Sequence, residues 1–82
     1  MAKIAVISAI LENPTSCQEE FNSVVASFRG SIKGRMGIPC EGQISVVSIT
    51  VIGELDDINA LTGRLGNIRD VTVKTAIAKK EI

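Results

Sequence analysis

Two long apolar runs constrain the fold of this chain more than any other feature. They cover residues 3–11 (KIAVISAIL) and 43–52 (QISVVSITVI), and both are rich in β-branched residues. Strands with one exposed face usually alternate apolar and polar residues, whereas runs that are apolar at almost every position are typical of strands covered on both faces. The sequence therefore predicts two strands in the middle of one sheet.

The residues after the first run have helical spacing. Apolar side chains recur at the three- and four-residue intervals of one helix face. They are Cys17, Phe21, Val24, Val25 and Phe28. Three starts are open for this helix: Asn13 followed by Pro14 at the first helical position, Thr15 paired with Gln18, or Ser16 paired with Glu19. We expect Gly30 to end it.

A second helix is expected after the second run. Gly53 is predicted to end the strand, and Asp56 is a plausible N-cap for the helix. The apolar face of this helix consists of Ile58, Leu61, Leu65 and Ile68. Residues 71–78 (VTVKTAIA) then predict a last strand, because they are rich in β-branched residues.

Residues 31–38 alternate between two kinds of side chain. Ile32, Gly34, Met36 and Ile38 fall on one side, and Ser31, Lys33 and Arg35 fall on the other. The alternation predicts a half-exposed edge strand, with Met36 and Ile38 in the core. Residues 37–42 (GIPCEG) predict a turn after it, since glycine tolerates positive φ and proline fixes its own φ.

The predicted order of elements is strand, helix, strand, strand, helix, strand, and it occupies residues 1–82 as a single domain. Two split βαβ units in this order form a ferredoxin-like fold, which is an α+β sandwich. Right-handed crossovers place the first and third strands in the middle of a four-stranded antiparallel sheet, with two helices on one face. The edge strands then carry Lys33, Arg35 and Lys74.

The central strands have two different faces. One is entirely apolar and consists of Ala5, Ile7, Ala9, Leu11, Val47, Ile49 and Val51. The other mixes apolar residues with hydroxyls and consists of Ile4, Val6, Ser8, Ile10, Ile44, Val46, Ser48, Thr50 and Ile52. We assign the first face to the helices, which leaves the mixed face open. Because large exposed apolar patches mark interfaces, we expect a homo-oligomer, a dimer or tetramer; the alternative is a register displaced by one residue, which exchanges the faces.

The composition argues against several classes of protein. Nine basic residues balance nine acidic ones, so there is no basic excess for nucleic acid. No apolar run approaches the ~20 residues that cross a bilayer. Histidine is absent, and Cys17 and Cys40 are too few ligands for a zinc site. We therefore expect a cytoplasmic protein that is not an enzyme, holds no cofactor or metal, and contacts neither nucleic acid nor a membrane directly.

The two cysteines have different expected environments. Cys17 lies on the apolar face of the first helix and is expected to be a buried, inert thiol. Cys40 lies in the predicted turn and is expected to be more exposed. A redox role would require a lowered pKa and a resolving partner, and the sequence indicates neither.

Three motifs carry a resemblance to a known family. They are residues 34–39 (GRMGIP), 60–66 (ALTGRLG) and 71–76 (VTVKTA). In this order and spacing they resemble the regulators of the iron-only hydrogenase system, which are small ACT-like proteins of about this length. The resemblance covers nearly the whole chain. It implies an ACT-like regulatory domain that acts on hydrogenase-linked genes or assembly.

Two other groups with a similar fold differ from this chain at their ligand sites. The ligand-binding domain of nickel-responsive regulators needs histidines for nickel, and this chain has none. Amino-acid-binding ACT domains usually have a glycine where the first strand meets the first helix, and this chain has Asn13, Pro14 and Thr15 there. The resemblance therefore implies neither nickel sensing nor amino-acid binding for this chain.

The GRMGIP motif supplies one group of candidate ligand-binding or interface residues. These are Arg35, Met36, Gly37, Ile38 and Pro39. Arg35 could hold a carboxylate or phosphate in a bidentate fork. The alternative is a solvated charge on an edge strand, and for Gly37 and Pro39 it is a role in the turn alone.

The second helix supplies the other group of candidates, which are Asn59, Thr62, Gly63 and Gly66. At 100° per residue, Gly63 lies opposite the apolar face, with Asn59 and Gly66 nearby. A glycine in a helix interior costs about 0.8–1 kcal/mol relative to alanine, and no core packing explains Gly63. We therefore expect an outward stripe of small residues that lets another molecule approach.

Two functions are compatible with the sequence. The first is an oligomeric regulator that responds to a small-molecule effector and has no DNA-binding element of its own, because the predicted elements leave no segment for one. The second is an interaction or assembly module that contacts hydrogenase-maturation proteins and binds no effector.

Overall fold

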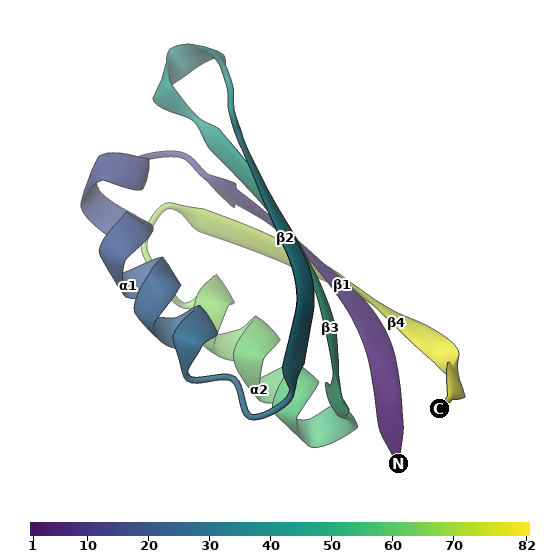
Figure 1. Cartoon of the computed structure of the whole chain (residues 1–82). Coiled ribbons are helices and arrows are strands. Elements are labelled where there is room, and N and C mark those ends of the chain that lie inside the picture. Colours follow the sequence, from purple (N-terminus) through teal and green to yellow (C-terminus); the bar gives the residue numbers. More distant parts are fainter.

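The computed structural model describes all 82 residues as a two-layer α/β sandwich (Figure 1). In chain order its elements are β1 (Ala2–Leu11), α1 (Pro14–Ala26), β2 (Ser31–Pro39), a short 3₁₀ turn (Glu41–Gln43), β3 (Ser45–Glu54), α2 (Leu55–Gly66) and β4 (Val71–Glu81). The strands pair antiparallel in the order β2-β3-β1-β4. Both helices lie on the same face of this sheet. The predicted ferredoxin-like fold, with the first and third strands in the middle, is confirmed.

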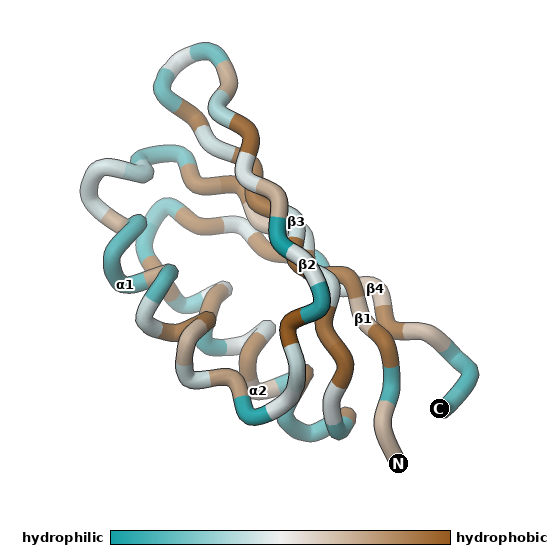
Figure 2. The backbone as a smooth tube through the Cα atoms, viewed as in Figure 1, coloured by the Kyte–Doolittle hydropathy of each residue, from teal (hydrophilic) through white to brown (hydrophobic).

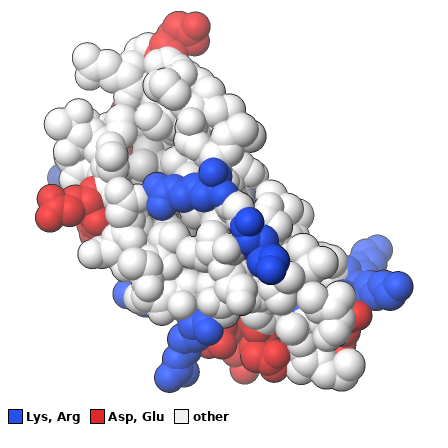
Figure 3. Space-filling model, in the orientation of Figure 1, with Lys and Arg blue, Asp and Glu red and all other residues white.

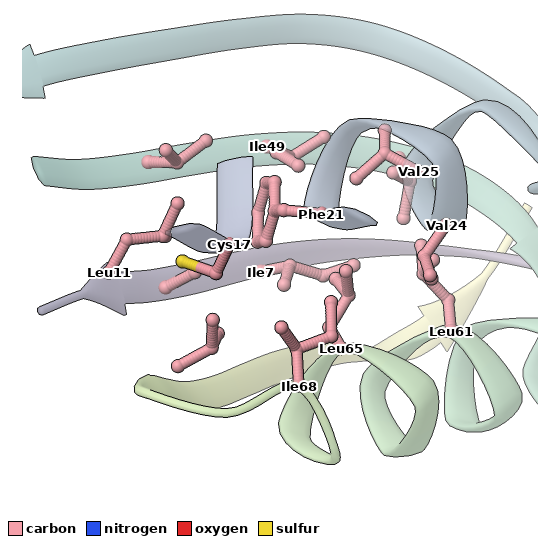
Figure 4. Close-up of a cluster of buried hydrophobic side chains, with 14 of the residues drawn as sticks. Ile7, Leu11, Cys17, Phe21, Val24, Val25, Ile49, Leu61, Leu65 and Ile68 are labelled. Atoms are coloured by element: carbon pink, nitrogen blue, oxygen red, sulfur yellow. The ribbon is translucent and has the colours of Figure 1, made fainter. Parts of the chain in front are cut away.

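The hydrophobic core lies between the sheet and the two helices. Figure 4 shows side chains of α1 and α2 pointing toward those of β1 and β3. All seven residues of the predicted apolar face are buried: Ala5, Ile7, Ala9, Leu11, Val47, Ile49 and Val51. The helices meet them with Phe21, Ile58 and Leu65, which have no exposed surface. The assignment of this face to the helices is therefore confirmed.

The first helix begins as one of the three alternatives proposed. Asn13 occupies the N-cap position and Pro14 is the first helical residue, although the Asn13 side chain makes no capping hydrogen bond. The helix ends at Ala26, earlier than expected, and Ser27 is its C-cap, whose backbone N–H and hydroxyl both donate to the Val24 carbonyl. The prediction that Gly30 ends the helix is wrong.

The second helix begins two residues earlier than expected. Its N-cap is Glu54, so Asp56 is not the cap but part of the first turn. There the positive end of the helix dipole stabilises a carboxylate. The helix ends at Gly66, and Ile68 is still buried in the following turn. β3 continues through Gly53 to Glu54, so Gly53 does not end that strand.

The prediction for β2 is wrong in two respects. Its pairing with β3 is irregular between Ile32 and Gly34, so Ile32 lies opposite buried Val51 on the helix side, whereas Met36 lies opposite Ser48 on the open side. Met36 and Ile38 are 58% and 46% exposed and are not core residues. Nothing in the chain covers that side of an edge strand.

The turn after β2 is shorter than the sequence predicted. Gly37, Ile38 and Pro39 belong to the strand, and the turn lies between Cys40 and Ile44. The positive φ that the turn requires occurs at Gly42 (68°) and at Gln43 (60°). Pro39 fits the last position of an edge strand, since its missing N–H costs no ladder bond there.

The hairpin formed by β2 and β3 gives the molecule its elongated shape. Its tip extends past the N-terminal end of α1 (Figure 1), and the molecule measures 39 × 19 × 16 Å. No helix of the protein is both long and apolar enough to span a bilayer. Cys40 is exposed in the turn of this hairpin, as expected.

Candidate functional site

The open face is the side of the sheet that the helices do not cover. Residues directly opposite each other on neighbouring strands form rows across the sheet, and three rows of this face span β2, β3, β1 and β4 in that order. The first row is Gly34, Thr50, Val6 and Ala76, and the middle row is Met36, Ser48, Ser8 and Lys74. The last row is Ile38, Val46, Ile10 and Thr72. Ile4 and Ile52 pair beyond the first row. We refer to this surface as the open face.

Large apolar side chains are exposed on the open face. Ile4, Val6 and Ile10 are each about two-fifths exposed, although they belong to the central strand β1. The hydropathy colouring in Figure 2 shows that apolar residues continue along the strands out to the hairpin of β2 and β3. A patch of this kind on a small domain is typical of contact surfaces.

The middle row of the open face is polar at its centre. Ser8 lies directly opposite Ser48 on β3 and opposite Lys74 on β4. Lys74 is the only charged residue in the three rows. The alternation of the strands indicated which residues share this face, but it did not predict that these three residues lie side by side. The signal available in the sequence was the serines within the apolar runs, Ser8 in the first and Ser45 and Ser48 in the second.

Arg35 lies on the helix side of β2, opposite Ile49. Its Nη2 donates to Asn22 Oδ1 at 2.6 Å, and its guanidinium lies 5.6 Å from the centre of the Phe21 ring. Arg35 thus joins β2 to α1 through a hydrogen bond and a cation–π contact, and its remaining N–H donors can still bind an anion. Figure 3 shows basic side chains over β2, with acidic ones nearer the helices and the ends of the molecule.

The residues of the GRMGIP motif do not form one site. Met36 and Ile38 lie on the open face, whereas Arg35 faces α1. Gly37 and Pro39 lie opposite Val47 and Ser45, on the helix side. An added Cβ at Gly37 would meet no atom within 4 Å, so the monomer gives no packing reason for this glycine.

The candidate residues of α2 divide in the same way. Asn59, Gly63 and Gly66 are exposed, and an added Cβ at either glycine would meet open space. Thr62 points instead toward β4. Its hydroxyl donates to the Ile58 carbonyl and lies 2.8 Å from the hydroxyl of Thr75. The outward stripe therefore consists of Asn59, Gly63 and Gly66 without Thr62.

The helix side of the molecule has three hollows, and the largest, of about 360 Å³, is an open depression along α1 lined by Pro14, Thr15, Gln18, Glu19 and Asn22. The other two have partly apolar linings. The smaller, of about 80 Å³, lies between the end of α1 and α2 and is lined by Ser27, Phe28, Arg29, Asp57, Ala60, Leu61 and Arg64. Arg64 Nη1 donates to Ser27 Oγ there at 2.8 Å. The larger, of about 300 Å³, lies at the start of α1 and is lined by Asn13, Ser16, Cys17, Glu20, Ile68, Arg69 and Asp70. No sequence motif predicted these hollows.

Cys17 is buried beside the 300 Å³ hollow, as expected from its position on the helix face. Burial raises the pKa of its thiol above the ordinary value, and the negative charge of Asp70 raises it further. A thiol with a raised pKa stays protonated at neutral pH and is a poor nucleophile. The geometry thus gives Cys17 a packing role.

Comparisons with known structures support the same fold. The structure of the uncharacterized protein TM1266 from Thermotoga maritima is 26% identical, with a TM-score of 0.89 over 96% of this chain and 100% of that one. The ACT domain of GTP pyrophosphokinase from Chlorobium tepidum is 17% identical, with a TM-score of 0.80 over 93% and 100%. The C-terminal domain of the MgtC protein from Mycobacterium tuberculosis is 10% identical, with a TM-score of 0.68 over 98% and 92%.

A comparison with curated proteins found no match. A protein-family model does match this chain over residues 3–75, which include all three motifs noted in the sequence except the last residue of VTVKTA. That model describes TM1266-like iron-only hydrogenase system regulators. The resemblance inferred from the motifs is therefore confirmed, and the chain belongs to the TM1266-like family of iron-only hydrogenase system regulators.

Proposed function

We propose that this protein is a non-catalytic, cytoplasmic regulator of the iron-only hydrogenase system that works as a homo-oligomer. In this proposal it responds to a small effector or a protein partner and reaches its target without a DNA-binding element of its own. The observation that carries the proposal is the open face, where Ile4, Val6, Ile10, Met36 and Ile38 are all exposed.

A second copy of the chain is the occupant that best fits the open face. Four strands about 4.8 Å apart and about 30 Å long give roughly 570 Å² per copy, or about 1,100 Å² for two. Specific interfaces need about 1,000 Å² or more. Lys74 is the only charge in the three rows, so two copies meet with little like-charge repulsion. A twofold dimer uses the same patch on both subunits.

Self-association can be tested by light scattering at micromolar concentration. We expect a dimer or a tetramer for the wild type and a folded monomer for Ile10→Lys, because the charge would be buried in the middle of an apolar interface. Thr15→Lys adds the same charge on the exposed side of α1 and should leave the assembly unchanged. A wild-type monomer at these concentrations would contradict the proposal.

Regulation without direct DNA contact is supported by the fold, because every helix and strand is part of the sandwich. Both helices pack on the sheet, so neither is free to enter a groove. The net charge is zero, and non-specific DNA affinity depends on lysine and arginine neutralising phosphates. We expect no mobility shift of duplex DNA by the purified protein, and a salt-sensitive shift would overturn this part of the proposal.

The alternative is an assembly module without a small-molecule ligand. It is favoured by the stripe of Asn59, Gly63 and Gly66, because open space around both glycines lets another protein approach the α2 backbone closely. A panel of metabolites in thermal melts separates the two functions. A specific ligand at about 100 times its Kd adds about 2.7 kcal/mol. No response to any metabolite, together with capture of a hydrogenase-maturation protein, would favour the assembly module.

A further inference from the structure

We infer that Ser8, Ser48 and Lys74 form a binding site for a small oxyanion, a carboxylate or a phosphate, between two copies of the chain. This inference rests on the proposed pairing of the open faces. It adds to that proposal the place and the chemistry of a ligand. The observation behind it is the middle row of the open face, where three side chains with polar hydrogens follow one another across β3, β1 and β4.

The three side chains are close enough to act together. Residues directly opposite each other on antiparallel strands have Cβ atoms about 4.5–5.5 Å apart, and Ser8 is opposite both Ser48 and Lys74. The side-chain hydrogen bonds of the chain involve other residues. Two hydroxyls and one ammonium group are therefore available to a molecule that approaches the open face.

The shape of the open face provides space for a ligand at this row. Packed sheets lie about 10 Å apart when both inner faces carry side chains of ordinary size. On the two central strands, the row on one side contains Val46 and Ile10, and the row on the other side contains Thr50 and Val6. These larger side chains act as spacers. The two serines between them are shorter, so a second sheet packed on these spacers would leave a small polar gap over Ser8 and Ser48, bounded on the β2 side by Met36.

Charge determines which ligand the gap would accept. A second copy covers Lys74 with the same three rows, which contain no acidic residue. An ammonium group covered without a partner is costly, and pairing with an anion offsets this cost. Since the chain supplies no such anion on these rows, we assign that role to an oxyanion from solution. Its oxygens would accept from the two hydroxyls and from Lys74 Nζ.

The test measures the dimer dissociation constant in sodium phosphate, sodium succinate and sodium chloride at equal ionic strength. We expect phosphate or succinate to tighten the wild-type dimer about tenfold relative to chloride, which corresponds to about 1.4 kcal/mol. The anion that gives the larger effect identifies the source of the oxyanion. If both act alike, the site recognises the shared oxyanion chemistry.

Two substitutions distinguish specific binding from a general salt effect. Lys74→Met keeps an apolar stem and removes the charge, so the dimer should persist but lose its response to the oxyanions. Lys33→Met removes an exposed charge of β2 outside the three rows and should retain the response. Ser8→Ala should reduce the response while the dimer remains.

The possible failures have different meanings. A dimer of the wild type that responds equally to all three salts would overturn the oxyanion site and leave the self-association intact. An oxyanion response that is unchanged in Lys74→Met would overturn it as well. A wild-type monomer would instead contradict the proposed function on which the site rests.

Discussion

At the scale of single residues, Phe28 explains two of the glycines. Its ring packs over the backbone where the α1–β2 connection meets the end of β3. An added Cβ at Gly30 would collide with the Ile52 carbonyl oxygen and lie 2.7 Å from the Phe28 ring, and one at Gly53 would lie 2.8 Å from it. Gly30 is therefore required for close packing against the backbone of β3, whereas at Gly53 only the tip of the Phe28 ring would have to move. Spacing along the sequence does not show which ring lies above a glycine, and both glycines were therefore predicted to end an element.

Gly30→Ala is expected to destabilise the protein. Overpacking a tight site costs about 1–3 kcal/mol, and one of the colliding atoms is a backbone oxygen that cannot rotate away. The measurement is the free energy of unfolding in denaturant. Gly37→Ala is the matched control on the helix side of β2, where an added Cβ meets nothing within 4 Å. Equal stabilities of the two variants would contradict this account of Gly30.

Gly63→Ala tests whether another molecule contacts α2. The methyl group meets no atom of its own chain, so in an isolated subunit it should add about 0.5–1 kcal/mol through helix propensity. We predict instead that it weakens assembly or partner binding, because the stripe with Asn59 and Gly66 has no other explanation. Denaturant melts and light scattering on the same samples give the answer. A more stable variant with unchanged assembly and binding would make Gly63 an ordinary surface residue.

At the scale of elements, the sequence predicted the strands and helices that have a continuous periodic pattern. β1 and β3 are apolar along their whole length, and the faces that they present follow from simple alternation. The prediction failed for β2, because the irregularity between Ile32 and Gly34 reverses the faces of the strand and no residue type marks it. The predicted start of α2 also differs from the observed one. Glu54 occupies the N-cap without a side-chain hydrogen bond, so no capping residue in the sequence marks this position.

The candidate site could be predicted only in part. The sequence identified the open face, because residues of one strand face are two positions apart. It could not show that Ser8 faces both Ser48 and Lys74, since strand register depends on turns and irregularities many residues away. The contact of Arg35 with Asn22 and Phe21 could not be predicted either. It depends on which side of β2 carries the guanidinium, and that also follows from the register.

The contact between α2 and β4 provides a test at this scale. The hydroxyls of Thr62 and Thr75 lie 2.8 Å apart and are half-buried. Thr62→Val leaves the Thr75 hydroxyl without this partner, which should cost about 1 kcal/mol of unfolding free energy. The double variant with Thr75→Val should cost less than the sum of the two single variants, as expected for residues in contact.

The control for this pair is Thr62→Ser, which keeps the hydroxyl and should recover most of the stability. All four variants can be compared in denaturant melts under one set of conditions. Strictly additive effects would mean that the two hydroxyls do not stabilise the packing of α2 on β4.

At the scale of the whole molecule, the core is small relative to the surface around it. Only 16 of the 82 residues are buried, and all of them lie between the sheet and the helices. A domain of this size has a marginal core. Burial of the open face in a dimer would add Ile4, Val6, Ile10, Met36 and Ile38 to the apolar surface removed from water. Folding and self-association should therefore stabilise each other.

This coupling predicts a melting temperature that depends on protein concentration. When two chains unfold from one dimer, a tenfold increase in concentration stabilises the dimer by about 1.4 kcal/mol. With about 2.1 cal/mol/K of unfolding entropy per residue over two chains, Tm should rise by about 4 °C. Ile10→Lys should melt at a lower temperature that is independent of concentration, because its unfolding involves one chain. A wild-type Tm that stays constant over a hundredfold range of concentration would show that the open face does not contribute to stability through a second copy.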